Sequence, residues 1–175
     1  MADDSRCVDT FLADPAAVLD AFDASLQQAA TAREVAWLLA ETTGAALGLD
    51  DCIIYLLQDD HDTLLQSAAW GGKQIARRII EHPIRLLLGE GIVGTAAQTH
   101  MPLQVADSRL YPHYVVDDEA RLSELAVPII DANGGLIGVL DTEHPAADHF
   151  CSRHLQAAAL LIAAAVRRLA ALQRE

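Results

Sequence analysis

The stretch "SELAVPIIDANGGLIGVLDTEH", residues 123–144, decides the fold. Two short apolar runs flank the polar segment "DANGG". Asn133, Gly134 and Gly135 in that segment readily adopt the positive φ angles that a hairpin turn requires. The stretch therefore predicts two antiparallel strands joined by a tight turn.

Strand patterns also occur earlier in the chain. The runs "CIIYLLQ", residues 52–58, and "TLLQSAAW", residues 63–70, flank the polar turn "DDHD" and predict a second antiparallel hairpin. "PIRLLL", residues 83–88, is a further strand candidate, and "PLQVAD", residues 102–107, is a short extended piece. These segments together predict an antiparallel sheet.

Helical patterns lie at both ends of the chain. Asp14 and Pro15 suit the start of one helix, and Thr31 with Glu34 has the spacing of a capping box at the start of a second. A long helix rich in Ala and Leu is predicted from about Ser152 to Gln173, with Ser152 as its cap. Strands flanked by helices indicate the α+β class. We expect a flexible N-terminus over residues 1–10 and a single domain over residues 11–175.

Composition limits the classes of function. The chain has 175 residues, of which 52% are hydrophobic, and a formal net charge of −13, which disfavours nucleic-acid binding. It shows no secretory signal and no run of roughly 18–20 uninterrupted apolar residues, so we expect a cytoplasmic protein without a membrane span. The three cysteines are widely spaced and form neither a CxxC pair nor a disulfide framework.

The order of several motifs resembles that of the GAF domain. These motifs are "LGEGIVGTAAQTHMPLQVAD", "SELAVPI" and "GGLIGVLDTEHP", followed by a phenylalanine and a long helix. The resemblance extends from about Thr31 to Val166 and is greatest to the sensor modules of bacterial histidine kinases and other signalling proteins. It implies a central antiparallel sheet of about five to six strands. N- and C-terminal helices would cover one face, and a loop-covered ligand pocket would lie on the other.

One enzyme branch of this family, free methionine-(R)-sulfoxide reductase, is similar over the same stretch. Its chemistry uses cysteine thiolates, because a thiolate attacks the sulfoxide sulfur readily. The positions that match its reactive cysteines hold Pro83, Val93 and Asp117. The resemblance therefore implies that this chain has no catalytic residues for that reaction.

The same branch holds its amino-acid substrate partly with acidic groups, and the matching positions are Glu124, Asp141 and Glu143, with Glu143 replacing an aspartate. Glu124 and Asp141 lie in otherwise apolar strands, where a carboxylate needs a partner or water. One interpretation is a charge at a strand end, solvated or paired with Arg121 or Arg85. The other is a pocket that recognises a cationic or amino group.

The connection "LYPHYVVDDEARL", residues 110–122, is the best candidate for a recognition loop. Tyr111, His113 and Tyr114 offer flat apolar surfaces with polar tips, which suit a small-molecule site. We add Leu122 to these candidate ligand-binding residues. The alternative is a loop that merely packs on the sheet through its aromatic side chains.

Other patterns predict no site. The glycines of residues 89–94 lack a following lysine, and Glu90 would repel a phosphate, so they indicate a bend before a short helix. His144, His149 and His154 match no short ligand motif, and we interpret them as surface histidines. We therefore predict neither a metal site nor a cofactor.

The sequence favours a non-catalytic sensory module that binds an unidentified small ligand. Its last helix has more apolar surface than one sheet face needs, which predicts a homodimer through the N- and C-terminal helices. A downstream histidine kinase or another output domain would be its partner. Two alternatives stay open: an enzyme similar to free methionine sulfoxide reductase, and a dimerisation scaffold with a vestigial pocket.

Overall fold

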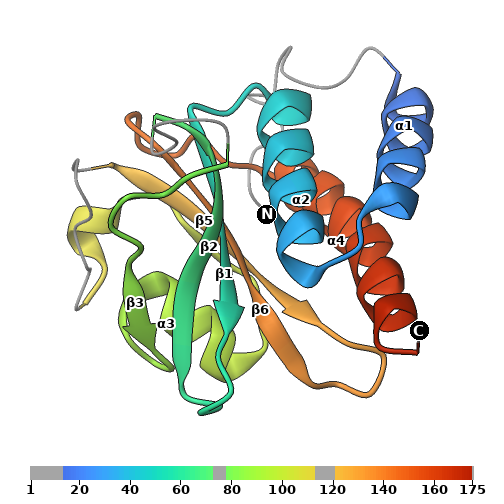
Figure 1. Ribbon diagram of the computed structural model, residues 1–175. Coiled ribbons are helices and arrows are strands. Elements are labelled where there is room, and N and C mark those ends of the chain that lie inside the picture. The colour runs from blue at the N-terminus through green and yellow to red at the C-terminus, as the bar shows by residue number, and fades with distance from the viewer. Residues whose placement is uncertain (1–13, 73–77, 113–120, 175) are drawn as a thin grey trace.

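Six antiparallel strands form one sheet in the computed structural model, which describes residues 14–72, 78–112 and 121–174 (Figure 1). The strand order is β3-β2-β1-β6-β5-β4, so β1 lies beside β6 although the two are far apart in the sequence. This sheet confirms the predicted α+β class and strand number. The elements are α1 Pro15–Gln28, α2 Ala32–Leu47, β1 Asp51–Leu57, β2 Thr63–Gly71, β3 Arg85–Leu87, α3 Gly91–Thr99, β4 Leu103–Val105, the 3-10 helix η2 Ser108–Leu110, β5 Ser123–Ile130, β6 Leu136–His144 and α4 Ser152–Leu172.

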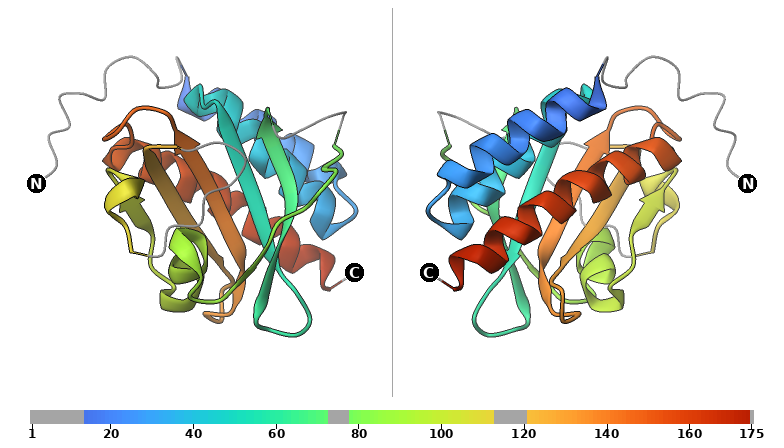
Figure 2. Two further views of the ribbon diagram at one scale, coloured as in Figure 1. Left: turned by 90° about the vertical axis from the view of Figure 1, so that its left-hand side faces the viewer. Right: turned by 90° about the vertical axis from the view of Figure 1, so that its right-hand side faces the viewer.

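The two faces of the sheet carry separate cores. Helices α1, α2 and α4 cover one face, whereas α3 lies against the other (Figure 2). Because successive side chains of a strand point to opposite faces, Ile54 and Leu125 pack under the three helices, while Ile53 and Ala126 pack on the α3 side. The terminal helices share one face, as predicted. Residues on the other face are therefore available to line a site.

Local side-chain bonds explain where the helices begin. The Asp14 carboxylate accepts hydrogen bonds from the backbone of Ala16 and Ala17, both at 3.1 Å, as its predicted capping role requires. The Thr31 hydroxyl accepts from the Glu34 backbone at 3.2 Å, and the Glu34 carboxylate accepts from the Thr31 backbone at 3.0 Å. This reciprocal pair confirms the capping box.

The predicted cap of α4 is wrong by one residue. Ser152 is the first helical residue, and Cys151 before it occupies the capping position. The Cys151 backbone N–H donates a hydrogen bond to Nδ1 of His154 at 3.2 Å, so the imidazole takes the role that a Glu or Gln side chain has in a capping box. α4 is long and apolar enough, by length and composition alone, to cross a membrane. In this structure it packs on α2, α1 and β5 as a core helix of the domain.

Replacing Thr31 by alanine is expected to lower the free energy of unfolding by about 1 kcal/mol, because it removes the acceptor for the Glu34 backbone N–H. Urea denaturation followed by circular dichroism measures this change. Thr31→Ser keeps the hydroxyl and is expected to retain most of the stability. Equal losses in the two variants would show that the methyl group, and not the cap, stabilises α2.

The glycine-rich segment is a bend, as predicted. Gly89 and Gly91 have φ angles of 84° and 63°, which favour glycine. Gly94 approaches the backbone so closely that a Cβ there would lie 2.3 Å from the Leu87 carbonyl oxygen. The Glu90 carboxylate accepts a hydrogen bond from the Leu87 N–H at 2.8 Å. The Glu90 side chain therefore folds back to the end of β3 and does not cap α3.

Candidate functional site

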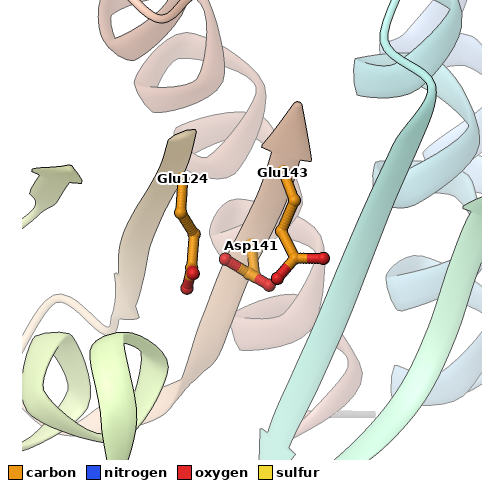
Figure 3. Close-up of side chains that lie close together, drawn as sticks. All are labelled: Glu124, Asp141 and Glu143. Carbon is orange, nitrogen blue, oxygen red and sulfur yellow. The ribbon is translucent and has the colours of Figure 1, made fainter. Parts of the chain in front are cut away.

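Strand register brings the three predicted carboxylates together on the α3 side of the sheet. Glu124 of β5 lies directly opposite Glu143 of β6, and Asp141 precedes Glu143 by two residues on the same face. Asp141 in turn lies opposite Ile53 of β1 and Ala126 of β5. The three side chains extend from neighbouring strands toward one another (Figure 3). We call Glu124, Asp141 and Glu143 the carboxylate cluster.

The carboxylate cluster is buried. Glu124, Asp141 and Glu143 are 3%, 2% and 5% exposed, and one oxygen from each lies within 4.8 Å of the others. Negatively charged carboxylates that are this close together and shielded from water repel one another strongly. Burial raises the pKa of the Asp141 carboxyl well above its usual range, and the neighbouring carboxylates, first that of Glu124, raise it further. The interpretation of a solvated charge at a strand end is therefore wrong.

Asp51 is a fourth buried carboxylate beside the cluster, and the sequence did not reveal it. It lies at the start of β1 and is 1% exposed. Its Oδ1 accepts a hydrogen bond from the Glu143 backbone N–H at 2.9 Å, and its carbonyl oxygen accepts one from the Thr142 hydroxyl at 2.7 Å. Asp51 therefore fixes the end of β6 that carries Glu143.

Arg121 forms an ion pair with Asp51, its Nη2 lying 3.7 Å from Oδ2. The sequence suggested Arg121 as a partner of Glu124 or Asp141, and the structure also brings it to Asp51. Arg85, the other suggested partner, is an exposed residue of β3 at the far edge of the sheet. Asp51 thus has a cation within ion-pairing distance.

Tyr55 of β1 also lies close to the cluster. It is 3% exposed, and burial raises the pKa of its phenol well above the usual value. The Asp141 carboxylate is the next largest cause of that rise, followed by Glu143 and Glu124. Tyr55 therefore contributes a buried aromatic ring on the same face of the sheet as the cluster. The sequence pattern predicted it only as a strand residue.

The predicted recognition loop is described only in part. Tyr111 follows η2, is half-buried and packs against the apolar core on the α3 side. Leu122 is half-buried, and its backbone N–H donates to the His144 carbonyl oxygen at 3.0 Å. His113 and Tyr114 lie outside the described residues. The structure therefore places Leu122 beside the ends of the strands that carry the cluster.

The described positions that match the reactive cysteines of the reductase differ from one another in burial. Val93 is 5% exposed inside α3, Pro83 is exposed before β3, and Asp117 lies outside the described residues. Cys52 is buried under the helices, on the opposite face of the sheet from the cluster, and burial raises the pKa of its thiol. Cys151 is disulfide-bonded, although the spacing of the cysteines predicted no disulfide framework.

The structure corrects the interpretation of three histidines as surface residues. The His144 and His149 rings are stacked with centroids 3.5 Å apart, and the His154 ring, 2% exposed, lies 5.4 Å from that of His149. Burial lowers the pKa of His149 to about 4, and repulsion from His144 and His154 contributes. Burial also lowers the pKa of His154. These rings pack between the end of β6 and the start of α4.

This packing predicts that stability falls as the pH drops from 6.5 toward 4. An unfolded histidine binds its proton near its ordinary pKa of 6.5, whereas folded His149 binds it only near 4, so acid favours the unfolded chain in this interval. His149→Phe keeps an aromatic ring that cannot titrate and is expected to flatten the decline. Urea midpoints between pH 7.5 and 4 measure it, with His82→Phe at an exposed position as the control. Parallel pH profiles for His149→Phe and the wild type would contradict the prediction.

Two hollows lie among the helices and are not lined by the cluster. One, of about 590 Å³, opens between α1, α2 and β2 beside Trp70. The other lies between α1 and α4. Neither brings titratable groups together as the carboxylate cluster does.

The sequence model of the GAF domain family matches residues 30–169, most of the chain. The chain belongs to the GAF domain family. Among curated relatives, free methionine-R-sulfoxide reductase of Saccharomyces cerevisiae is 32% identical over 111 residues, which are 62% of this chain and 58% of that protein. Protein YtsP of Bacillus subtilis is 31% identical over 67 residues, 38% of this chain and 40% of that protein. This GAF domain thus spans about half the length of the curated relatives it matches.

Solved structures support the same fold. A GAF sensor protein from Burkholderia vietnamiensis superposes with a TM-score of 0.77 at 25% identity, over 92% of this chain and 96% of that one. Free methionine-R-sulfoxide reductase from Neisseria meningitidis, solved with its substrate, gives a TM-score of 0.77 at 22% identity, over 94% and 96% of the two chains. At that identity the second likeness shows the fold alone. GAF domains similar to this one therefore include both a sensor and reductases.

Proposed function

We propose that this GAF domain is a non-catalytic sensory module that binds a small, positively charged ligand at the carboxylate cluster. The observation that carries the proposal is the convergence of three buried carboxylates on the face opposite the terminal helices. Buried negative charge of this density needs a cation or protons to balance it. A positively charged ligand supplies that balance only when it is bound, which is what a sensor requires.

The chemistry of the site supports binding over reduction of a sulfoxide. Reduction by a thiol needs a thiolate beside the substrate. Val93 contributes an apolar side chain to the α3 side, and the buried Cys52 thiol lies on the opposite face, where burial disfavours its thiolate. The carboxylates that would hold a substrate are present, but the residues described around them supply no thiolate.

We propose that ligand binding is transmitted to a partner by the terminal helices of a cytoplasmic homodimer. Leu160 of α4 is 56% exposed, and Val18 and Leu19 of α1 line a groove with it. An apolar helical surface of this kind suits a helix from a second copy. Ligand binding would shift the population of two arrangements of these helices, and a histidine kinase or another output domain would respond.

Thermal denaturation with a panel of cations tests the binding proposal. The panel contains divalent metal chlorides, free amino acids including methionine and its sulfoxide, and polyamines. A true ligand at 100 times its Kd stabilises the fold by about 2.7 kcal/mol, which raises the Tm by roughly 5–10 °C for a chain of this size. If no compound in the panel raises the Tm, the sensory proposal fails.

Two further measurements address the alternatives. Turnover of free methionine sulfoxide with dithiothreitol as reductant would establish the enzyme. Light scattering is expected to show a dimer, and a monomer would overturn both the helix-mediated signal and the dimerisation scaffold.

A further inference from the structure

We propose that Glu124, Asp141 and Glu143 bind one hard divalent metal ion of the Mg²⁺, Mn²⁺ or Ca²⁺ class. This inference rests on the proposed function and names the chemical class of its ligand. The three side chains come from two adjacent strands, β5 and β6, whose backbone ladder fixes their spacing. A site built on paired strands is already in place before the ion arrives.

The donor set matches hard cations. One carboxylate oxygen from each residue lies within 4.8 Å of the other two, so a single ion can contact all three. Mg²⁺, Mn²⁺ and Ca²⁺ prefer oxygen ligands, whereas sites for zinc and copper are usually built with histidine or cysteine. The cluster offers only carboxylate oxygens.

An independent observation points to a bound cation. Oδ1 of Asp141 is buried and has no hydrogen-bond partner among the residues that the structure describes. Asp141 itself is 2% exposed and lies between Glu124 and Glu143 (Figure 3). An unpaired buried carboxylate oxygen is energetically costly, and buried charges are usually paired or bound to a metal. A metal ion at the centre of the cluster gives this oxygen its missing contact.

Charge favours a divalent ion over an organic ammonium group. The cluster carries three potential negative charges, and the neighbouring Asp51 adds a fourth carboxylate that forms an ion pair with Arg121. A divalent ion offsets twice the negative charge that a single ammonium group does. Asp51 also accepts the Glu143 backbone N–H, so it positions a ligand residue without having to bind the ion itself.

Isothermal titration of the full chain with MnCl₂, after dialysis against EDTA and then against metal-free buffer, tests the proposal. We expect one Mn²⁺ per chain with a Kd of about 10 μM or tighter, and competition by Mg²⁺ or Ca²⁺. Electron paramagnetic resonance of free Mn²⁺ gives the stoichiometry independently. Asp141→Asn is expected to weaken binding at least about tenfold, because a neutral amide replaces the central anion. Asp20→Asn, the same change at an exposed residue of α1, is expected to leave the Kd unchanged.

The possible results separate the two levels of the proposal. Binding of an amino acid or polyamine that Asp141→Asn abolishes, without any Mn²⁺ binding, overturns the metal site and leaves the sensory function intact. Absence of binding to every cation in the panel overturns both. Equal Mn²⁺ affinity in the wild type and in a folded Asp141→Asn variant, as judged by circular dichroism, places the ion elsewhere and also overturns the metal site.

Discussion

Replacing Gly138 by alanine is expected to lower the free energy of unfolding by about 3 kcal/mol. Gly138 lies in the middle of the sheet, where β6 pairs with both β1 and β5. A Cβ at this position would lie 2.1 Å from the Tyr55 carbonyl oxygen and 3.2 Å from the Leu56 Cα. Both are backbone atoms, so β1 must move away from β6 to admit a single methyl group. Urea denaturation measures the loss.

Two other glycines separate steric overlap from backbone strain. A Cβ at Gly72 would meet no atom within 4 Å, and the φ angle of Gly72 is not positive. Gly72→Ala is therefore expected to change the free energy of unfolding by no more than about 0.5 kcal/mol. Gly134 also has nothing within 4 Å, but its φ is +86°, and Gly134→Ala is expected to lower stability by about 1 kcal/mol. If Gly138→Ala unfolds at the same urea concentration as Gly72→Ala, the close approach of β1 and β6 is wrong.

The same sheet shows what the sequence could predict and what it could not. The turn "DANGG" correctly predicted the β5–β6 hairpin, because turn residues are a local signal. The register within the hairpin was not predictable from the turn alone. Ile130 pairs with Leu136, but a β-bulge between Ile129 and Ile130 shifts every later pair by one residue. Without the bulge, Glu124 would lie opposite Thr142 rather than Glu143, and the cluster would not assemble.

Long-range pairing explains the residues that were missed. Asp51 meets Glu143 only because β1 pairs with β6, and no feature of the sequence near Asp51 announces that contact. The three clustered histidines come from β6, α4 and the connection between them, and their spacing of five fits no single-helix motif. Glu124, Asp141 and Glu143 were found through the resemblance to the family and the apolar setting of Glu124 and Asp141. Their burial was the property that only the fold could supply.

Replacing Asp141 by asparagine is expected to raise the free energy of unfolding of the metal-free protein by about 1–3 kcal/mol. In the wild type this carboxyl is buried beside Glu124 and Glu143, and its high pKa reflects how strongly the fold opposes its charge. The unfolded chain ionises it freely, so the folded state is penalised at neutral pH. Asparagine removes the charge at nearly constant volume, and its amide can donate a hydrogen bond to the Glu124 carboxylate. Urea denaturation in EDTA measures the gain.

Metal should reverse this order. At 100 times its Kd, Mn²⁺ stabilises the wild type by about 2.7 kcal/mol, because it binds the folded state alone, whereas Asp141→Asn gains much less. The variant is therefore expected to be the more stable protein in EDTA and to lose most or all of that advantage in saturating Mn²⁺, while Asp20→Asn follows the wild type in both. A variant that is less stable than the wild type in EDTA would mean that Asp141 is a structural partner within the fold. The carboxylate would then be retained for stability, and the argument that its charge is held ready for a cation would fail.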